Sequence, residues 1–305
     1  MKIGIIGSGA LGLYYGAMLQ RSGQNINFLL RRDYHALQKT GLQVHSCNGD
    51  FHLPQISGSL SAQEIGAVDL VIVGLKTISN HHLIDLVRPL LGPETAILTL
   101  QNGLGNEDLL AEAFGAERVL GGVAFLCSNR GEPGTVYHLG EGKIILGEFN
   151  SGLSQRSCDL AAMFQAAGVP CTAVSDLRRA RWEKLVWNIP FNGLCALLEE
   201  DVTNLLNHSQ SKELVRNLML EVITGANAQG LEELIDGSGF SQRLISFTEN
   251  MDHYQPSMLI DRIEGRLLEL EAIYAIPLQQ AKAVGVNMPQ VEMLHTLLSY
   301  GESEP

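Results

Sequence analysis

The chain divides into two stretches by its pattern of hydrophobic and polar positions. Up to residue 174, short runs of branched apolar side chains alternate with helical patterns and glycine-containing turns. Such runs are typical of strands buried on both faces of a parallel sheet. We expect strands at the start of the chain and over 25–30, 68–75, 95–100, 118–124 and 169–174, and a β-hairpin over 133–148 that turns at 140–142. The pattern predicts an α/β domain over residues 1–174.

From residue 175 to 305 the strand-like runs disappear and helical periodicity takes over. Residues 181–198 have the pattern of one helix. Residues 258–275 have the pattern of another, with Ser257 as its natural N-cap. The sequence therefore predicts a second, helical domain over 175–305, and a chain of 305 residues is long enough for two domains.

The first strand leads directly into a glycine motif. Gly7-x-Gly9-x-x-Gly12 follows an isoleucine-rich run and precedes a helical pattern, the order in which this spacing indicates dinucleotide binding. Gly7 permits the tight turn, Gly9 lets a pyrophosphate approach the backbone, and Gly12 lets the helix lie close to the strand. The helix N-terminus then presents free N–H groups to the phosphates. The alternative is a glycine-rich turn that binds nothing.

Arg31 and Arg32 follow the second strand, about 20 residues after the glycine turn. An acid at this place would bind the ribose 2′-hydroxyl of NAD, whereas an arginine can pair with the 2′-phosphate of NADP. No acid occurs before Asp33, so the sequence favours NADP; the alternative is a solvated basic loop. Lys76 and Asn102 close two other strands, where sheets of this kind bind ligands. A solvated lysine and an ordinary Asn-Gly turn would give the same pattern.

Charge and composition exclude several kinds of partner. The net charge of −12 argues against nucleic acid and anionic membranes. No apolar run reaches the ~18–20 residues of a membrane span, and the first residues form a strand rather than a signal peptide. Five cysteines without a C-x-x-C pair suit a reducing cytoplasm, where we expect free, buried thiols. His81 and His82 have no carboxylate or cysteine near them in sequence, so we predict no metal site.

Polar side chains recur on one face of the helix expected at 181–198. Lys184, Asn188 and Asn192 are spaced i, i+4, i+8 in an otherwise apolar segment. Burying such groups is costly unless they have partners, so the stripe indicates either a functional site or an ordinary amphipathic helix. Pro190 would kink the helix or free a carbonyl group, which leaves the direction of Asn192 open.

The helix expected after Ser257 could hold a substrate carboxylate at its N-terminus. Glu264, Glu269 and Glu271 follow, interleaved with arginines. We expect most of these acids to form surface ion pairs, and one of them could turn inward.

Together these motifs resemble a known family. They are GSGALG at 7–12, Arg31, Lys76, QNGLG at 101–105, RWEKLVWNIPFN at 181–192, and SMLID at 257–261 with Glu269 downstream. Their order and spacing resemble the 2-dehydropantoate 2-reductases, also called ketopantoate reductases, over almost the whole chain. The resemblance implies a Rossmann-type domain and an all-α domain like that of 6-phosphogluconate dehydrogenase, with the site between them. It also implies NADPH-dependent reduction of 2-dehydropantoate, a 2-oxo acid, to pantoate in pantothenate biosynthesis.

The resemblance also implies roles for individual positions. Lys184 looks like the catalytic acid and Glu269 like its acidic partner. An ammonium can stabilise the charge that develops on a keto oxygen and then donate a proton, and a carboxylate can orient the ammonium. The implied substrate-binding residues are Asn102, Asn188, Asn192 and Ser257. The implied NADP(H)-binding residues are Gly7, Ser8, Gly9, Ala10, Leu11, Gly12, Arg31, Lys76, Asn102 and Glu269.

Three positions depart from the family pattern and leave the substrate open. Pro256, Ile260 and Tyr274 stand where the family often has Ser or Thr, Gln, and Asn. One alternative is an NADP-dependent reductase of a different branched 2-oxo acid. Another is a non-catalytic NADP-binding sensor, which would predict loss of Lys184 or Glu269, and both are present. The sequence is compatible with a monomer or a homodimer.

Overall fold

The computed structural model describes residues 1–150 and 152–302, so residue 151 of the expected first domain and residues 303–305 of the expected second lie outside it. The chain forms two compact units. The first comprises Met1–Asn102 and Asn106–Leu177, and the second comprises Gly103–Gly105 and Arg178–Pro305. The short loop that contains Leu104 therefore belongs to the second unit, where Leu104 is part of the hydrophobic core.

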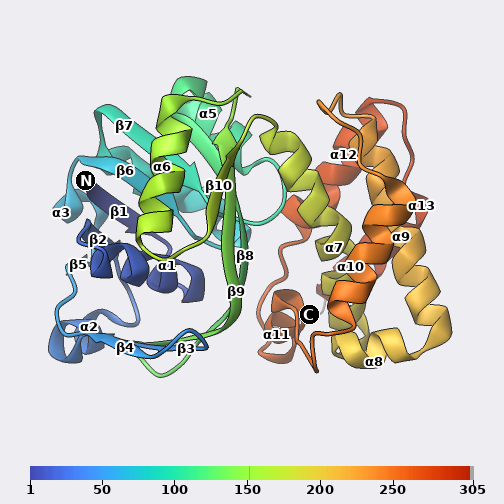
Figure 1. Ribbon diagram of the computed structural model, residues 1–305, viewed down its shortest axis with the longest axis horizontal. Helices are drawn as coiled ribbons and strands as arrows, with labels where there is room; N and C mark the ends of the chain where they lie inside the picture. The colour runs from blue at the N-terminus through green and yellow to red at the C-terminus, as the bar shows by residue number, and fades with distance from the viewer. Residues whose placement is uncertain (151, 303–305) are drawn as a thin grey trace. The chain divides into compact units, whose positions relative to one another are not determined.

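The first unit is built on one ten-stranded sheet (Figure 1). Its strands are β1 (Lys2–Ile6), β2 (Asn25–Leu29), β3 (Leu42–Ser46), β4 (Phe51–Leu53), β5 (Gly58–Ser59), β6 (Val68–Val73), β7 (Leu91–Thr99), β8 (Val119–Arg130), β9 (Thr135–Glu148) and β10 (Cys171–Val174). They lie in the order β4-β3-β9-β8-β7-β6-β1-β2-β5, with β10 paired to β9. The pairs from β8 through β7, β6 and β1 to β2 are all parallel, as in a Rossmann-type sheet.

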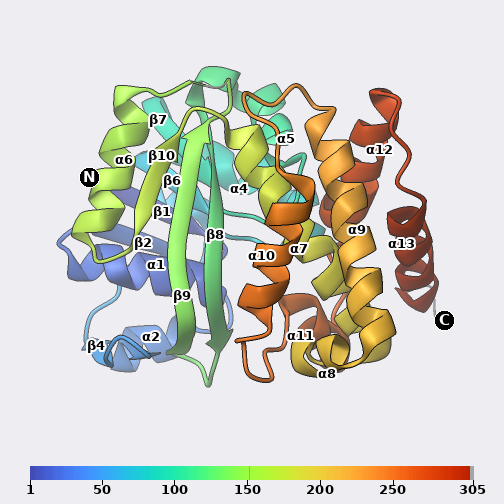
Figure 2. The same ribbon diagram turned by 45° about the vertical axis from the view of Figure 1, so that its right-hand side comes forward.

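Helices cover both faces of this sheet, and Figure 2 shows α6 beside β10 on one of them. The helical segments are α1 (Ala10–Arg21), α2 (Tyr34–Thr40), α3 (Ala62–Ile65), η1 (Thr77–His82), α4 (Leu83–Val87), η2 (Arg88–Leu90), α5 (Asn106–Phe114), η3 (Ala116–Arg118) and α6 (Gln155–Ala166). Leu70 and Ile72 of β6 share a core with α1 and α6, whereas Val71 and Val73 pack with α3, α4 and α5. Alternate side chains of this apolar strand therefore point to opposite faces of the sheet, and each set packs in a separate core.

Three adjacent parallel strands bring the expected residues of this unit to one edge. β1 pairs with β6, and β6 pairs with β7. Just past β6, the Gly74 N–H donates a hydrogen bond to the Ile6 carbonyl (2.7 Å). The glycine turn after β1, Lys76 after β6 and Asn102 after β7 therefore all follow carboxyl ends of neighbouring strands, where sheets of this kind bind ligands.

The hairpin expected over 133–148 is wrong. β9 continues through this segment and pairs antiparallel with β8, so the chain reverses at 131–134 instead. Glu141 and Gly142 have positive φ angles, 61° and 118°, where the register shifts between Phe125 and Leu126. They form a bulge within the strand, which accommodates turn-type residues without reversing the chain.

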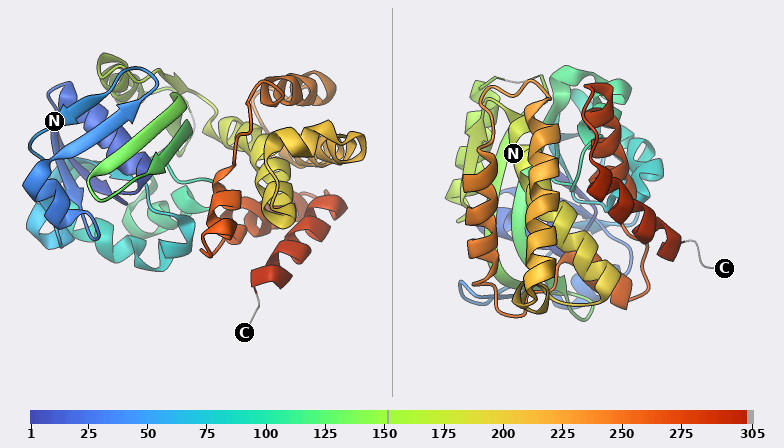
Figure 3. Two further views of the ribbon diagram at one scale, coloured as in Figure 1. Left: turned by 90° about the horizontal axis from the view of Figure 1, so that it is seen from below. Right: turned by 90° about the vertical axis from the view of Figure 1, so that its right-hand side faces the viewer.

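Helices and their connecting loops make up the second unit, which contains no strand among the residues that the structure describes (Figure 3). Its elements are α7 (Leu177–Leu198), α8 (Val202–Asn207), α9 (Ser209–Asn227), α10 (Gly237–Thr248), α11 (Ser257–Ile263), a π-helical turn η4 (Glu271–Ala275), α12 (Ile276–Ala283) and α13 (Pro289–Glu302). Trp182, Ile189 and Tyr274 are among the side chains that fill its core. No helix among the described residues is long and apolar enough to cross a membrane.

The single helix expected over 258–275 is also wrong. α11 ends before Gly265, which has a φ of +65°, and the next regular turn is η4. The Arg266 N–H returns to the Asp261 carbonyl (2.8 Å), and its Nε donates to the buried Asp261 Oδ1 (2.8 Å). A left-handed glycine ends a helix at little cost, and the arginine then fixes the chain in its new direction.

The five cysteines are free, as expected, but only two are buried. Burial raises the pKa of Cys171 and Cys195 to about 12. Cys47 and Cys158 are exposed, because Cys47 follows the end of β3 and Cys158 lies on the solvent side of α6; Cys127 is half-buried.

Candidate active site

The glycine turn between β1 and α1 is tightly packed at its first and third glycines. Gly7 has a φ of +94°, and a Cβ there would lie 2.3 Å from the backbone nitrogen of Leu75. A Cβ on Gly12 would lie 2.2 Å from the Gly7 carbonyl oxygen. Both contacts are with backbone atoms, which cannot move without disturbing the adjacent strands. The packing of the turn itself therefore requires these two glycines.

Gly9 faces open space instead. A Cβ on Gly9 would meet no atom within 4 Å. Gly9 is the N-cap of α1, and among the described residues no side chain caps this helix and no acid lies in its first turn, which begins with Ala10 and Leu11. The uncapped N–H groups and positive end of the helix dipole attract an anion, and the space above Gly9 admits one. The turn thus fits the pyrophosphate of a dinucleotide.

The end of β2 is tied to this turn and carries the two arginines. Ser8 Oγ donates to the Leu29 carbonyl (2.8 Å), which fixes the turn against β2. Asp33 is only 3% exposed and forms ion pairs with Arg32 and Arg130. Arg31 is exposed, and its side chain has no hydrogen-bond or ion-pair partner among the described residues. The carboxylate of Asp33 is therefore paired with Arg32 and Arg130, whereas Arg31 can bind an anion.

A chain of amide side chains holds the backbone at Asn102, and most of its members were not predicted from the sequence. Gln101 Nε2 donates to Asn80 Oδ1 (2.7 Å), and Asn80 Nδ2 donates to Asn106 Oδ1 (2.9 Å). Asn106 Nδ2 then donates to the Asn102 carbonyl (2.9 Å). Lys76 is partly exposed at the start of η1 in the same unit. Asn80 and Asn106 thus join the residues that position this edge, although nothing in their local spacing indicates it.

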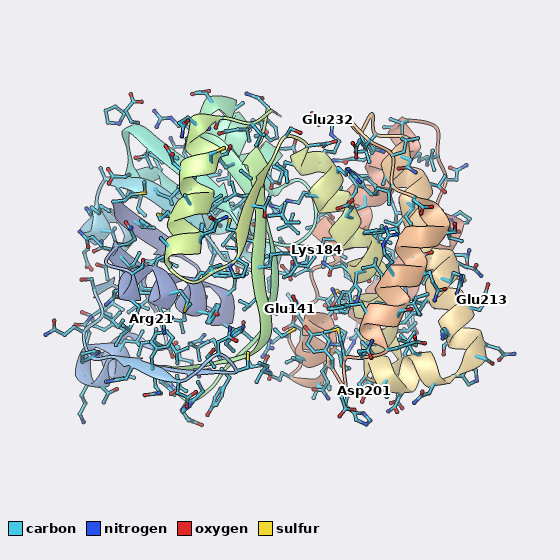
Figure 4. All side chains as sticks on the ribbon, in the orientation of Figure 1. Arg21, Glu141, Lys184, Asp201, Glu213 and Glu232 are labelled. Atoms are coloured by element: carbon cyan, nitrogen blue, oxygen red, sulfur yellow. The ribbon has the colours of Figure 1, made fainter. Side chains whose placement is uncertain are left out.

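Helix α7 carries Lys184, Asn188 and Asn192 in the second unit, and Figure 4 labels Lys184 on this helix. The helix continues through Pro190, so the i, i+4, i+8 spacing does place them near one face. Asn188 and Asn192 are 3% and 2% exposed, and Lys184 is partly exposed. The Asn188 amide has no hydrogen-bond partner among the described residues. This amide is also not among the fully enclosed polar atoms that lack a partner, so it can be reached from outside and is available for a ligand.

Asn192 connects α7 to the start of α11. Its Oδ1 accepts a long hydrogen bond from the Met258 N–H (3.5 Å). Ser257, expected as the N-cap, is instead the exposed first residue of α11, and Pro256 takes the N-cap position. The fixed φ of proline suits the approach to a helix, so the serine side chain is not used as a cap.

Glu269 lies in the irregular segment between α11 and η4. It is 4% exposed, whereas Glu264 and Glu271 are exposed. Its carbonyl accepts a hydrogen bond from the Ile273 N–H (3.2 Å), which joins it to the following turn. Of the three acids considered from the sequence, Glu269 is thus the one that turns inward.

A dinucleotide-binding turn holds a cofactor but provides no proton donor for the reaction. In this chain the second unit carries such a group, a lysine, together with two asparagines on the same helix. The protein is an oxidoreductase that uses a nicotinamide cofactor. A family model described as ketopantoate reductase PanE/ApbA matches residues 3–151, and the model of the C-terminal part of the same family matches residues 176–302. The chain belongs to the ketopantoate reductase family, which confirms the resemblance.

Individual relatives agree with this assignment. A 2-dehydropantoate 2-reductase of Nostoc sp. is 41% identical over 304 residues, which cover 98% of this chain and 94% of the relative. A 2-dehydropantoate 2-reductase from Geobacter metallireducens, known from its crystal structure, has 59% sequence identity to this chain. The two structures have a TM-score of 0.97, and the match covers 99% of this chain and 100% of that one. A D-mandelate dehydrogenase, solved with NADH and anilino(oxo)acetate, shares the fold at 24% identity, with a TM-score of 0.90 over 99% and 98% of the two chains. The expected fold, an α/β domain joined to an all-helical domain, is confirmed.

Proposed function

We propose that this protein reduces 2-dehydropantoate to pantoate with NADPH, a step towards pantothenate. The observation that carries the proposal is the amide of Asn188, a residue only 3% exposed whose side chain makes no hydrogen bond among the described residues, on the helix that bears Lys184. An amide has both donors and an acceptor, which suits a substrate with a hydroxyl, a keto group and a carboxylate. The names of the relatives at 41% and 59% identity support the same substrate.

The proposed chemistry divides between cofactor and protein. When bound, NADPH supplies the hydride that reduces the C2 carbonyl. Lys184 stabilises the negative charge that develops on the keto oxygen and donates a proton to that oxygen. Glu269 orients the ammonium group and maintains its charge. Asn102, Asn188, Asn192 and Ser257 bind the substrate through its hydroxyl and carboxylate groups.

The proposed cofactor contacts follow from the first unit. The glycine turn at 7–12 would hold the pyrophosphate on the α1 N-terminus. Arg31 would bind the 2′-phosphate, and Lys76, Asn102 and Glu269 complete the proposed contacts. Asp33 is already paired with Arg32 and Arg130, so this acid is not free to favour the ribose hydroxyl of NADH.

Replacing Lys184 tests the catalytic assignment. Lys184→Ala should lower kcat for NADPH oxidation with 2-dehydropantoate by about 10²–10⁴-fold, the range of general acid catalysis. NADPH affinity, measured by fluorescence titration, should stay near the wild-type value. Lys282→Ala is the matched control, because Lys282 is an exposed lysine on α12. Turnover that survives in the Lys184 variant would show that another group donates the proton.

Replacing Arg31 tests the choice of cofactor. Arg31→Ala should weaken NADPH binding by about 1.5–3 kcal/mol, the range for hydrogen bonds to charged groups, and leave NADH binding nearly unchanged. Arg32→Ala is the control, because Arg32 already contacts the Gly131 carbonyl (2.7 Å) and Asp33. Equal losses for both cofactors would refute a contact with the 2′-phosphate.

A different branched 2-oxo acid is the second candidate substrate. Pro256, Ile260 and Tyr274 depart from the family pattern in or near the helix that starts at Ser257. The D-mandelate dehydrogenase of similar fold, solved with anilino(oxo)acetate, supports a broader range of 2-oxo acids on this scaffold. Measuring kcat/KM on 2-dehydropantoate beside other branched 2-oxo acids decides between the two. A wild-type enzyme that ignores 2-dehydropantoate but reduces another would establish the second.

We also propose a cytoplasmic enzyme that is a monomer or a homodimer. The five free cysteines suit a reducing compartment. Size-exclusion chromatography with light scattering would distinguish the two assembly states, and a larger mass would contradict both.

A further inference from the structure

Tyr274 is a fully buried tyrosine whose hydroxyl group has a specific partner. Its Oη donates a hydrogen bond to the Ile189 carbonyl of α7 (2.8 Å). Its ring lies parallel to the His295 ring of α13, with centroids 6.0 Å apart and an interplanar angle of 10°. Burial raises the pKa of Tyr274 well above its ordinary value, so the hydroxyl keeps its proton and acts as a donor.

The accepting carbonyl lies at the weak point of α7. Ile189 directly precedes Pro190 and lies between Asn188 and Asn192 in the sequence. Proline removes one helical N–H donor and crowds the preceding turn, so the helix is less constrained here than elsewhere. The Tyr274 hydroxyl therefore anchors α7 at the place where the direction of the two asparagines is most easily changed.

Gly193 leaves the space that this anchor needs. A Cβ on Gly193 would lie 2.4 Å from Tyr274 Oη and 2.8 Å from Leu294 Cδ2. Gly193 is buried with the rest of this helix segment, so no side chain could turn away into solvent. A glycine in the middle of a helix costs roughly 0.5–1 kcal/mol relative to alanine. Its presence here is explained by the close approach of the tyrosine.

The tyrosine also belongs to the segment that carries Glu269. Tyr274 lies in the π-helical turn η4, and Ile273 beside it donates to the Glu269 carbonyl (3.2 Å). A π-turn adds a residue to a helical turn and rotates the side chains that follow, and such turns are frequent at functional sites. One side chain thus links the Glu269 segment to the helix that carries Lys184, within a single unit.

We propose that Tyr274 is a positioning residue, whose hydroxyl holds α7 and the Glu269 segment in the arrangement that binds and protonates the 2-oxo acid. It acts through Ile189 and does not touch the substrate. This role rests on the proposed reductase function. It also gives a reason why tyrosine stands at this position, where the sequence departs from the family pattern.

Tyr274→Phe removes the hydroxyl group and keeps the ring. It should lower kcat/KM for the 2-oxo acid about three- to tenfold, the effect of one buried neutral hydrogen bond, chiefly through a higher KM. The dissociation constant for NADPH should change less than KM for the 2-oxo acid, because most of the proposed cofactor contacts lie in the first unit and only Glu269 lies in the segment that Tyr274 holds. Tyr15→Phe is the matched control: Tyr15 is equally buried, and its hydroxyl donates to the Gly142 carbonyl (3.3 Å) in the first unit.

The control separates positioning from stability. Both variants should unfold at a lower temperature, but only Tyr274→Phe should change KM or kcat for the 2-oxo acid. If both lose stability while both keep wild-type KM and kcat, Tyr274 is merely structural and the proposal is wrong. A wild-type protein that does not reduce 2-dehydropantoate contradicts the proposed substrate instead, and the comparison is then made with whichever branched 2-oxo acid it reduces.

A second pair of variants tests the contact with Gly193. Gly193→Ala should lower kcat/KM, because its Cβ would push Tyr274 away from Ile189. The same substitution should have a smaller relative effect in the Tyr274→Phe background, where no hydroxyl group meets the new methyl group. Independent, multiplicative effects of the two substitutions would overturn the proposed coupling.

Discussion

Replacing Gly9 with alanine should separate cofactor binding from folding. A Cβ at this position meets no atom within 4 Å, so the folded chain has room for it. That same space is where a pyrophosphate would approach the α1 N-terminus. We therefore expect Gly9→Ala to fold normally and to bind NADPH poorly.

The expected change in stability is small because two effects oppose each other. Gly9 has φ −78° and ψ −166°, an extended conformation that alanine adopts without strain. Alanine stabilises by about 0.4–1 kcal/mol because it restricts the unfolded chain. As an N-cap, however, alanine is poorer than glycine by a similar amount, of order 0.5–1 kcal/mol. The net change should stay within about 1 kcal/mol, or a few degrees in Tm.

Gly12→Ala provides the contrast. Its Cβ would lie 2.2 Å from the Gly7 carbonyl oxygen, so this variant should lose about 1–3 kcal/mol or more through overpacking. The assay combines thermal unfolding without cofactor and NADPH titration by fluorescence. If Gly9→Ala binds NADPH as the wild type does, the turn does not carry the pyrophosphate. If it unfolds like Gly12→Ala, the space at Gly9 is not open in solution.

Two further predictions follow from polar contacts elsewhere. Asn106→Ala should lower the free energy of unfolding by about 1–3 kcal/mol in a urea titration, because it leaves the Asn80 amide and the Asn102 carbonyl without their partner; an unchanged midpoint would contradict this. The hydrogen bond to Asp201 raises the pKa of His253, and although partial burial raises that of Asp201, hydrogen bonds from the backbone and from His253 lower it overall. The stability that His253 contributes is present below its ordinary pKa of 6.5 and is lost as the pH rises through its raised pKa. The stability that Asp201 contributes is present above its ordinary pKa of 3.8 and is lost as the pH falls through its lowered pKa. His253→Ala should therefore lower Tm more at pH 5.5 than at pH 9, and equal losses at both would refute the pairing.

Local pattern was sufficient where neighbours in sequence determine the structure. The glycine turn, the buried strands around it and the helix with Lys184 all follow from spacing, because each depends on contacts within a few residues. The helix continues through Pro190 in a segment that packs in the core of the second unit, where the Tyr274 hydroxyl contacts it at Ile189. Spacing alone left that outcome open, since Tyr274 is far from Pro190 in sequence.

Contacts between distant segments were not predictable in the same way. Residues 140–142 have the composition of a turn, but pairing with β8 keeps them in a strand as a bulge. Asn80 and Asn106 join through a side-chain hydrogen bond that no local motif encodes. Both outcomes depend on a strand or side chain that is distant in sequence and is brought near only by the fold. The periodicity of a single sequence contains no information on which distant segment that is.

Glu269 is the one of the three acids considered that is buried, and the reason is a break in the helix that the sequence pattern did not predict. In one continuous helix, Glu264 and Glu271 would lie seven residues apart on the same face, and Glu269 would lie on a different face. The break at Gly265 removes that relation, leaving Glu264 and Glu271 exposed and Glu269 buried. Burial of a carboxylate is costly unless compensating groups accompany it, so an acid that turns inward needs such groups in its own unit. The buried position of Glu269 therefore supports the role proposed for it with Lys184 more strongly than its distance along the sequence from Ser257 does.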